Sequence, residues 1–283
     1  MTARRAHRTA LGILMMLIAA CAGGTRPGAP ASPPPTQAKS SVPPAPGNWK
    51  LVFHDDFDGA RLDTSRWATC YDWNRNGCTI GTSKELEWYR PGQVSVGGGK
   101  LTLTATRRPT NGSDGRVHSW TSGMISTGRD NWYAQPRHTF TYGYFEAAIR
   151  IPSENGMSPQ FWMMPASRHT PPEIDIMEFL STTHELSMYI HFRGPKGTDK
   201  HRGAHFKSPG FPDGYHVFAL LWDVRKLVWY VDGVERWRVT DPAEVPKVPM
   251  EVIVNLAVGL PHPPPRSVDS ARMSVDWVRV WQR

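Results

Sequence analysis

Residues 171–180, PPEIDIMEFL, carry three acids, Glu173, Asp175 and Glu178, within a run of Ile, Met, Phe and Leu. Because a β-strand alternates its faces at every residue, Glu173 and Asp175 should share a face while Glu178 points the other way. The flanking residues are apolar and aromatic, so a solvated edge strand, the simplest alternative, describes the stretch poorly. We therefore predict a strand inside a sheet. Acids on such a strand are costly to bury, so we expect them to have a function.

A β-bulge, which places two residues opposite one on the neighbouring strand, explains the out-of-phase acid. If Ile176 and Met177 share one pleat position, Glu178 rejoins the face of the other two acids. Glu173 and Glu178 would then lie about 13 Å apart at Cα, with carboxyl groups about 5–6 Å apart. This separation is typical of retaining glycosidases, in which one carboxylate attacks the anomeric carbon and the other protonates the leaving oxygen. Three acids this close should raise at least one pKa.

The chain beyond residue 49 is rich in strand signals and poor in helical periodicity. Residues 93–106 predict a hairpin around a glycine-rich turn, and two turn signals divide residues 215–239 into a three-stranded meander. Residues 273–283, MSVDWVRVWQR, alternate apolar and polar positions as a final strand. The sequence shows no βαβ spacing and no fixed-period repeat. We predict an all-β fold, a jelly-roll β-sandwich of two antiparallel sheets.

The first 47 residues have the composition of an export signal and a tether. Three arginines precede the apolar run LGILMMLIAA, which predicts a signal peptide over residues 1–20. Ile18-Ala19-Ala20-Cys21 fits a bacterial lipobox, so we expect either lipidation at Cys21, which would anchor the protein to the membrane, or plain secretion. Residues 21–47 are dense in Pro, Ala, Gly and Ser and predict a disordered tether, followed by a folded domain at 48–283.

The charge of the chain limits its possible binding partners, and its cysteines predict a disulfide. Without the three arginines of the signal, 30 basic residues face 25 acidic ones, a net charge of about +5. The chain has no dense Lys/Arg run, so a nucleic-acid partner is not expected. Cys70 and Cys78 flank the loop CYDWNRNGC and should form a disulfide after export. A metal site is the alternative, but no His or Cys partner lies nearby in the sequence.

The pattern ExDxxE at Glu173, Asp175 and Glu178 resembles that of glycoside hydrolase family 16, in its laminarinase-like branch. The likeness continues in order along the chain, at LVFHDDFDG with LDTSRW, KELEWYRPGQVSVGGGKLTLTA, TYGYFEAAIRIP, PQFWMMP, WYVDGV, VNLAVG and VDWVRVW. It covers nearly all of residues 50–283.

The resemblance implies a concanavalin A-like jelly roll with a substrate cleft across its concave sheet. It implies that Glu173 is the nucleophile, Glu178 the general acid/base and Asp175 an electrostatic helper between them. The implied reaction is retaining endo-hydrolysis of a polysaccharide, with β-1,3-glucan as the first expected substrate. Such catalysis requires no cofactor, and we expect a monomer.

Five further residues are candidates for the substrate-binding surface. Trp88, Trp162 and Trp222 align with segments where the family has aromatics in or near the cleft, although tryptophan is also a core residue. His191 lies on the strand after the acids, where relatives often have a cleft histidine. Asn255 is polar within the apolar strand MEVIVNLAVG and must be hydrogen-bonded, either internally or to a sugar hydroxyl.

Asp276 is a candidate calcium ligand, because relatives often bind a structural calcium through an acid of the last strand; a simple exposed acid is the alternative. Elsewhere the chain departs from the family pattern. Relatives usually show Asn-Asn-Glu and Trp-Pro-Ala-Phe-Trp where this chain has Ser83-Lys84-Glu85 and Ser158-Pro159-Gln160-Phe161-Trp162, and LPHPPPRS replaces a glycine-rich end after VNLAVG.

Because these departures fall in the expected sugar-binding subsites, two other enzyme functions stay open: the same chemistry on a galactan or another polysaccharide, and transglycosylation. The competing class is a non-catalytic carbohydrate-binding lipoprotein. Such a protein would have no need of a proton donor among the acids.

Overall fold

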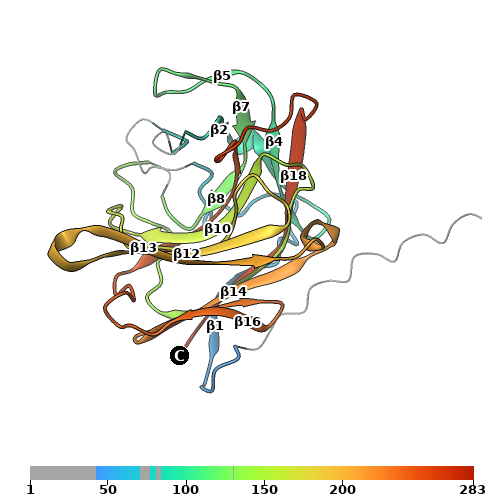
Figure 1. The fold of residues 1–283 in the computed structure, drawn as a ribbon. Coiled ribbons are helices and arrows are strands. Elements are labelled where there is room, and N and C mark those ends of the chain that lie inside the picture. The colour runs from blue at the N-terminus through green and yellow to red at the C-terminus, as the bar shows by residue number, and fades with distance from the viewer. Residues whose placement is uncertain (1–42, 71–76, 81–83, 130) are drawn as a thin grey trace, which may run out of the picture. The chain divides into compact units, whose positions relative to one another are not determined.

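The structure, a computed structural model, describes residues 43–70, 77–80, 84–129 and 131–283. The predicted signal peptide and Cys21 lie outside the described residues. The described chain consists mainly of two β-sheets that share a hydrophobic core, with a small two-stranded ribbon beside them (Figure 1). In this part of the chain no helix is long and apolar enough to span a bilayer.

The strands and short helices have the following bounds. Sheet A contains β1 (Lys50–Asp55), β2 (Glu87–Tyr89), β3 (Val94–Val96), β4 (Leu101–Thr106), β7 (Trp120–Ser122), β9 (Gly143–Arg150), β14 (His216–Asp223), β15 (Lys226–Val231), β16 (Val234–Val239) and β18 (Ser270–Gln282). Sheet B contains β8 (Met124–Ser126), β10 (Met157–Pro165), β11 (Glu173–Phe179), β12 (Glu185–Arg193), β13 (Asp199–Lys207) and β17 (Met250–Val258). The ribbon is β5 (Thr110–Asn111) with β6 (Val117–His118), and the 3-10 turns are η1 (Pro91–Gln93), η2 (Pro195–Gly197) and η3 (Phe211–Asp213).

Most neighbours in the two sheets come from distant parts of the chain. Sheet A has the order β16-β15-β14-β9-β18-β4-β7-β2, with β1 beside β18 and β3 beside β4, and sheet B has the order β13-β12-β11-β10-β17-β8. Apart from the parallel pair β2 and β7, the strands run antiparallel to their neighbours. The prediction of two packed antiparallel sheets is confirmed.

The predicted hairpin and meander are both present in sheet A. Val94 of β3 pairs with Leu103 of β4, and β14, β15 and β16 follow one another as antiparallel neighbours. In the turn between β15 and β16, Asp232 and Gly233 have φ of 51° and 76°. Two consecutive positive φ values are the type I′ geometry that an Asp-Gly pair favours, so this local sequence determines its own turn.

The core lies between the two sheets and takes alternate residues from each strand. In β17, Val252 and Val254 are buried in the core, whereas Ile253 joins a separate cluster on the other face of sheet B. Burying one such side chain contributes roughly 1.5–3 kcal/mol. Because alternate residues of each sheet B strand point into the core, the residues between them lie on the outer face, where polar side chains can also be placed.

Residues just before the predicted boundary at residue 48 already contact the folded domain. The Trp49 indole N–H donates to the Ala45 carbonyl at 2.7 Å, and both residues pack against a buried cluster on sheet A. The Arg283 guanidinium lies 4.9 Å from the Trp49 ring centre. Residues 45–47 therefore belong to the domain rather than to the tether.

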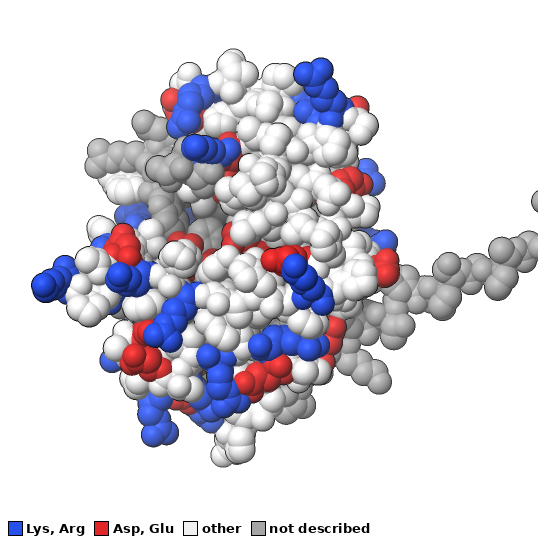
Figure 2. Space-filling view, viewed as in Figure 1, with Lys and Arg blue, Asp and Glu red and all other residues white. Residues whose placement is uncertain are grey.

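Charged side chains of both signs are interspersed on the visible surface, without one continuous basic patch (Figure 2). Several charged side chains of the domain are paired, such as Arg66 with Asp63 at 3.0 Å and Lys207 with Glu185 at 3.0 Å. Exposed pairs of this kind contribute only about 0–1 kcal/mol each. Their main effect is to balance the charge of the surface.

Trp222 is a core residue, so its assignment to the cleft was wrong. It lies on β14 of sheet A, is 1% exposed, and its indole N–H donates to the Pro246 carbonyl at 3.0 Å. Its ring packs against Phe145 and Tyr142. The apolar stretch around Trp222 predicts a strand, but it does not show which sheet the strand joins or which face is buried.

Replacing Trp222 by alanine should therefore destabilise the fold by about 3–5 kcal/mol, because it leaves a large cavity and an unpaired carbonyl in the core. Urea unfolding of the wild type and the variant measures this difference. Unchanged stability would contradict the core assignment.

Candidate active site

A β-bulge in β11 brings the three acids to one face of sheet B. Against β12 the register shifts between Asp175 and Glu178, so that Met188 alone faces both Ile176 and Met177. Against β10 the register shifts at the same place. The inserted residue returns Glu178 to the face of the other two acids, as the sequence predicted.

The strands on either side fix the neighbours of each acid. Gln160 and Ser187 lie opposite Glu178, Trp162 and Tyr189 lie opposite Asp175, and His191 lies opposite Glu173. The intervening residues of β11 are buried in the core on the other side. One face of β11 is thus apolar, and the other carries the acids toward the outside.

The three acids are buried for carboxylates, and their pKa values rise accordingly. The Glu173 side chain is 23% exposed and that of Asp175 9%. Burial, followed by repulsion from Asp175, raises the pKa of Glu173 to about 8. Burial and the charge of Glu178 raise the pKa of Asp175 well above its usual value, and burial raises that of Glu178. The surroundings of the cluster therefore favour protonated carboxyl groups, which is the direction that a general acid requires.

Glu178 is held by a chain of hydrogen bonds that crosses three strands. The Gln160 amide donates to a Glu178 carboxyl oxygen at 2.7 Å. The Asn255 amide donates in turn to the Gln160 carbonyl oxygen at 2.6 Å and to the Tyr89 hydroxyl at 3.0 Å. The Trp162 indole N–H donates to the Asn255 oxygen at 2.7 Å. Each amide thus has a fixed orientation, which aims a donor at one oxygen of Glu178.

His191 and Thr170 contact the other two acids. His191 Nε2 lies 3.2 Å from an Asp175 oxygen and 4.0 Å from a Glu173 oxygen. The Thr170 hydroxyl donates to Glu173 at 3.1 Å, which favours the ionised carboxylate. Ligand atoms of Glu173, Asp175 and His191 lie within 4.8 Å of one another, close enough to hold a metal ion and equally close enough to share protons.

Trp162 and Asn255 lie on the acid face, but other residues cover them. Trp162 is 4% exposed and Asn255 0%, so the internal alternative for the Asn255 hydrogen bonds is the correct one. Cys78, Ile80 and Tyr89 pack over this part of the face. Trp162 and Asn255 therefore position other side chains rather than touch a ligand themselves.

Trp88 does not reach the acid face, so its assignment to the cleft was also wrong. It lies on β2 of sheet A, where alternation sends its neighbour Tyr89 toward Asn255 and Trp88 to the opposite side. The Trp88 ring packs 5.0 Å from His118 and closely against Gly112. The sequence ELEWY contains the aromatic residue that reaches the site, one position later than predicted.

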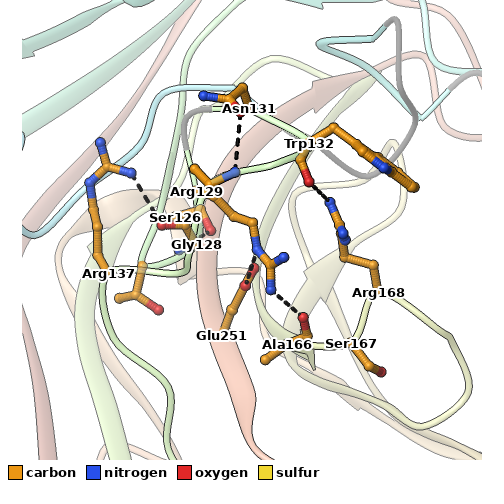
Figure 3. A network of polar contacts seen from close by, with 12 residues as sticks. Ser126, Gly128, Arg129, Asn131, Trp132, Arg137, Ala166, Ser167, Arg168 and Glu251 are labelled. Carbon is orange, nitrogen blue, oxygen red and sulfur yellow. Dashed lines mark hydrogen bonds and ion pairs between the residues drawn. The ribbon is translucent and has the colours of Figure 1, made fainter.

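Two loops are tied together at the end of sheet B where β11 begins (Figure 3). Glu251 of β17 is 2% exposed and lies 3.6 Å from the Arg129 guanidinium, which also donates to the Ala166 carbonyl. Arg168 donates to the Trp132 carbonyl at 2.6 Å and lies 3.9 Å from the Trp132 ring centre. These contacts fix the loop that leads from β10 to Glu173 against the loop that follows β8.

The remaining predicted residues are the two cysteines and Asp276. Cys70 and Cys78 form the predicted disulfide. Asp276 lies in β18, where the register against β9 shifts between Val275 and Trp277. It is 9% exposed, and its Oδ2 is buried without a hydrogen-bond partner in the described part of the chain. A buried unpartnered carboxylate oxygen suits a cation, so this donor fits the predicted calcium.

Comparison with known proteins agrees with this geometry. The profile of glycosyl hydrolases family 16 matches residues 82–279. The chain belongs to this family.

Similar proteins include a beta-glycanase and a beta-glucanase. The endo-1,3-1,4-beta-glycanase EglC of Rhizobium meliloti is 30% identical over 251 residues, which cover 81% of this chain and 51% of that protein. The beta-glucanase of Rhodothermus marinus is 30% identical over 269 residues, 83% of this chain and 86% of that protein. The chain spans about half the length of the curated relatives EglC and ExsH.

A solved structure of this kind has the same fold. The catalytic domain of an endo-1,3-beta-glucanase (laminarinase) from Thermotoga petrophila superimposes with a TM-score of 0.69 at 25% identity, over 83% of this chain and 98% of that domain. The jelly-roll prediction is thereby confirmed for this family 16 chain.

Two of the predicted departures from the family pattern meet where β10 begins and β11 ends. The Ser158 hydroxyl donates to the Leu260 carbonyl at 2.8 Å, and the Ser181 hydroxyl donates to the His262 carbonyl at 2.7 Å. The segment LPHPPPRS is thus held against the ends of β10 and β11.

Gln160, like Tyr89 and Thr170, contacts the site but was not among the predicted site residues. Its signal was present, because Gln160 is polar within the apolar run PQFWMMP, two residues before Trp162 and therefore on the same strand face.

Proposed function

We propose that this family 16 domain hydrolyses internal β-glycosidic bonds of a polysaccharide with retention of configuration. The supporting observation is the bulge that gathers Glu173, Asp175 and Glu178 on one face of sheet B. Two carboxyl groups on the same face, one able to attack as a carboxylate and one able to donate a proton, are the groups that a double displacement needs.

In the first half of the reaction, the ionised Glu173 attacks the anomeric carbon. Glu178 gives its proton to the glycosidic oxygen as the carbon–oxygen bond breaks, and the leaving sugar departs with a hydroxyl group. The sugar that stays is bound to Glu173 as an ester. Thr170 and His191 favour the ionised form of Glu173 before the attack.

In the second half, water replaces the departed sugar. Glu178, now a carboxylate, takes a proton from the water, whose oxygen attacks the anomeric carbon and releases Glu173. The Gln160 amide stabilises this ionised form of Glu178. Asp175 lies between the two glutamates, and its raised pKa allows it to hold a proton while Glu173 is charged.

The proposed substrate is a β-1,3-glucan or a mixed β-1,3-1,4-glucan. The support comes from the names of several relatives, which are endo-1,3-1,4-beta-glycanases and beta-glucanases. We also propose, from the sequence of residues 1–47 alone, that the protein is exported and attached to a membrane through lipid on Cys21.

Purified protein should release oligosaccharides from laminarin or from lichenan, and Glu173→Gln and Glu178→Gln should each reduce this activity at least about 100-fold. The reason is that one change removes the nucleophile and the other removes the proton donor. Reducing-sugar release measures both effects. Agarose and β-galactans test the alternative substrates in parallel.

Glu235→Gln, on β16 of sheet A, is the matched control and should keep full activity. Cleavage of agarose alone would move the substrate from glucan to galactan. Binding to a glycan without cleavage of any would contradict the proposal and favour a carbohydrate-binding protein.

Gln160→Ala should shift the basic limb of the kcat/KM pH profile upward by up to about one unit. The amide donor favours the charged form of Glu178, so its loss raises the pKa of the acid that must start protonated. Gln93→Ala, which removes an amide that donates to Thr121 instead, is the control. An unmoved basic limb would show that Gln160 does not tune the pKa of Glu178.

We further propose that Asp276 helps to hold a structural calcium ion, on the evidence of its buried and unpartnered Oδ2. Calcium added after chelator treatment should raise the unfolding temperature of the wild type, because a ligand that binds only the folded state stabilises it. Asp276→Asn should lose most of this response. Equal responses in the two proteins would place the ion elsewhere.

A further inference from the structure

We propose that Tyr189, seated over Gly203 between His201 and His205, is a stacking platform for a further pyranose unit of the polysaccharide. The platform lies on the β13 side of the catalytic acids. The inference rests on the proposed function, because it assigns a subsite to that reaction.

The position of the Tyr189 ring depends on a glycine in the neighbouring strand. Tyr189 of β12 pairs directly with Gly203 of β13. A Cβ atom added to Gly203 would lie 2.3 Å from both Cδ1 and Cε1 of the tyrosine ring. The ring therefore occupies the space in which any other residue would place its side chain. An aromatic ring that covers a glycine in an edge strand lies against the sheet and leaves its other side toward the outside.

Histidines flank this ring along both strands. The ring centre of Tyr189 lies 6.3 Å from that of His201, 5.9 Å from that of His205 and 6.1 Å from that of His191. The rings of His201 and His205 stand at 72° and 85° to the tyrosine, so each presents an edge to it. A flat aromatic ring surrounded by imidazole nitrogens combines a stacking surface with hydrogen-bonding groups, which suits the C–H face and the hydroxyls of a sugar.

His205 is held so that one of its nitrogens stays available. Its Nδ1 lies 3.0 Å from the Ser187 hydroxyl and 3.4 Å from a Glu185 carboxyl oxygen. These contacts engage Nδ1 and leave Nε2 for another partner. The 48% exposure of the His205 side chain means that such a partner can reach it from solvent.

The platform continues directly from the catalytic acids. Tyr189 lies opposite Asp175 in the sheet, and His191 contacts both the acids and His201. Neighbouring strands are about 4.8 Å apart, close to the length of one pyranose unit along a polysaccharide. A chain that crosses the strands from β11 toward β13 would therefore place its next sugar over Tyr189.

The other direction offers less open surface. Toward β17 and β8, the same face is covered by Cys78, Ile80 and Tyr89, which leave Trp162 only 4% exposed. Toward β13, His201, Gly203 and His205 are exposed, and the sheet ends. The accessible extension of the acid site is thus on the side of the platform.

The test measures binding of β-1,3-glucan oligosaccharides of three to six units by calorimetry, in the Glu178→Gln protein to prevent turnover. Tyr189→Thr in this background should weaken binding of the longer probes about tenfold and weaken binding of the shortest probe less, since a short oligosaccharide can also bind the acid face without a sugar over Tyr189. Tyr189→Trp should keep the affinity. Gly203→Val should reproduce the loss, because its side chain displaces the ring without removing it.

Tyr133→Ala, an 81% exposed aromatic on another loop, is the control and should bind like the parent. Thermal unfolding confirms that each variant is folded. Equal affinity of the Tyr189→Thr and parent proteins for the longest probe would overturn the platform, as would an equal loss in the control or a parent that binds none of the probes. Turnover of glucan by the wild type tests the proposed function separately, so the platform can fail while the enzyme assignment stands.

Discussion

Ile176 and Met177 both lie against Met188, and the position of Glu178 depends on this mismatch between two strands. Both residues are buried in the core, so the apolar side of β11 is kept while the alternation is reset. Without the extra residue, Glu178 would point into the core, where an unpaired carboxylate is strongly unfavourable. The bulge thus keeps the apolar residues of β11 in the core and also places Glu178 on the acid face. There Glu178 lies opposite Gln160 and Ser187.

The face that the bulge creates has two halves with different physical roles. Toward β17, Trp162, Asn255 and Gln160 form a buried hydrogen-bond chain that ends on Glu178. Because each polar group in this chain is paired, it orients the acid without leaving an unsatisfied atom. Toward β12 and β13, the histidines and Tyr189 are accessible to solvent. One half therefore positions the acids, and the other is free to contact a ligand.

Two of the differences from the expected family pattern lie at the strands beside Glu178, whereas the three acids themselves keep that pattern. Gln160 replaces a small residue and donates to the carboxyl group, while Ser158 and Ser181 hold the segment LPHPPPRS against the same strand ends. The raised pKa values arise from burial and mutual repulsion within the acid cluster itself. A substitution beside the acids can therefore change their environment and the shape of the site while the chemistry is preserved.

The amino-acid sequence by itself determined the features that depend on local pattern. Alternating residues predicted the strands, the Asp-Gly pair predicted a turn, and one out-of-phase acid among three in an apolar run predicted the bulge. Only the tertiary structure decided which face each tryptophan takes, since burial of Trp88 and Trp222 depends on strands distant in the sequence. It also decided the role of β13, whose residues DKHRGAHFK are mostly polar and show no strand pattern. That strand forms because β12 offers it nine backbone partners, and long-range pairing of this kind leaves no signal in the local sequence.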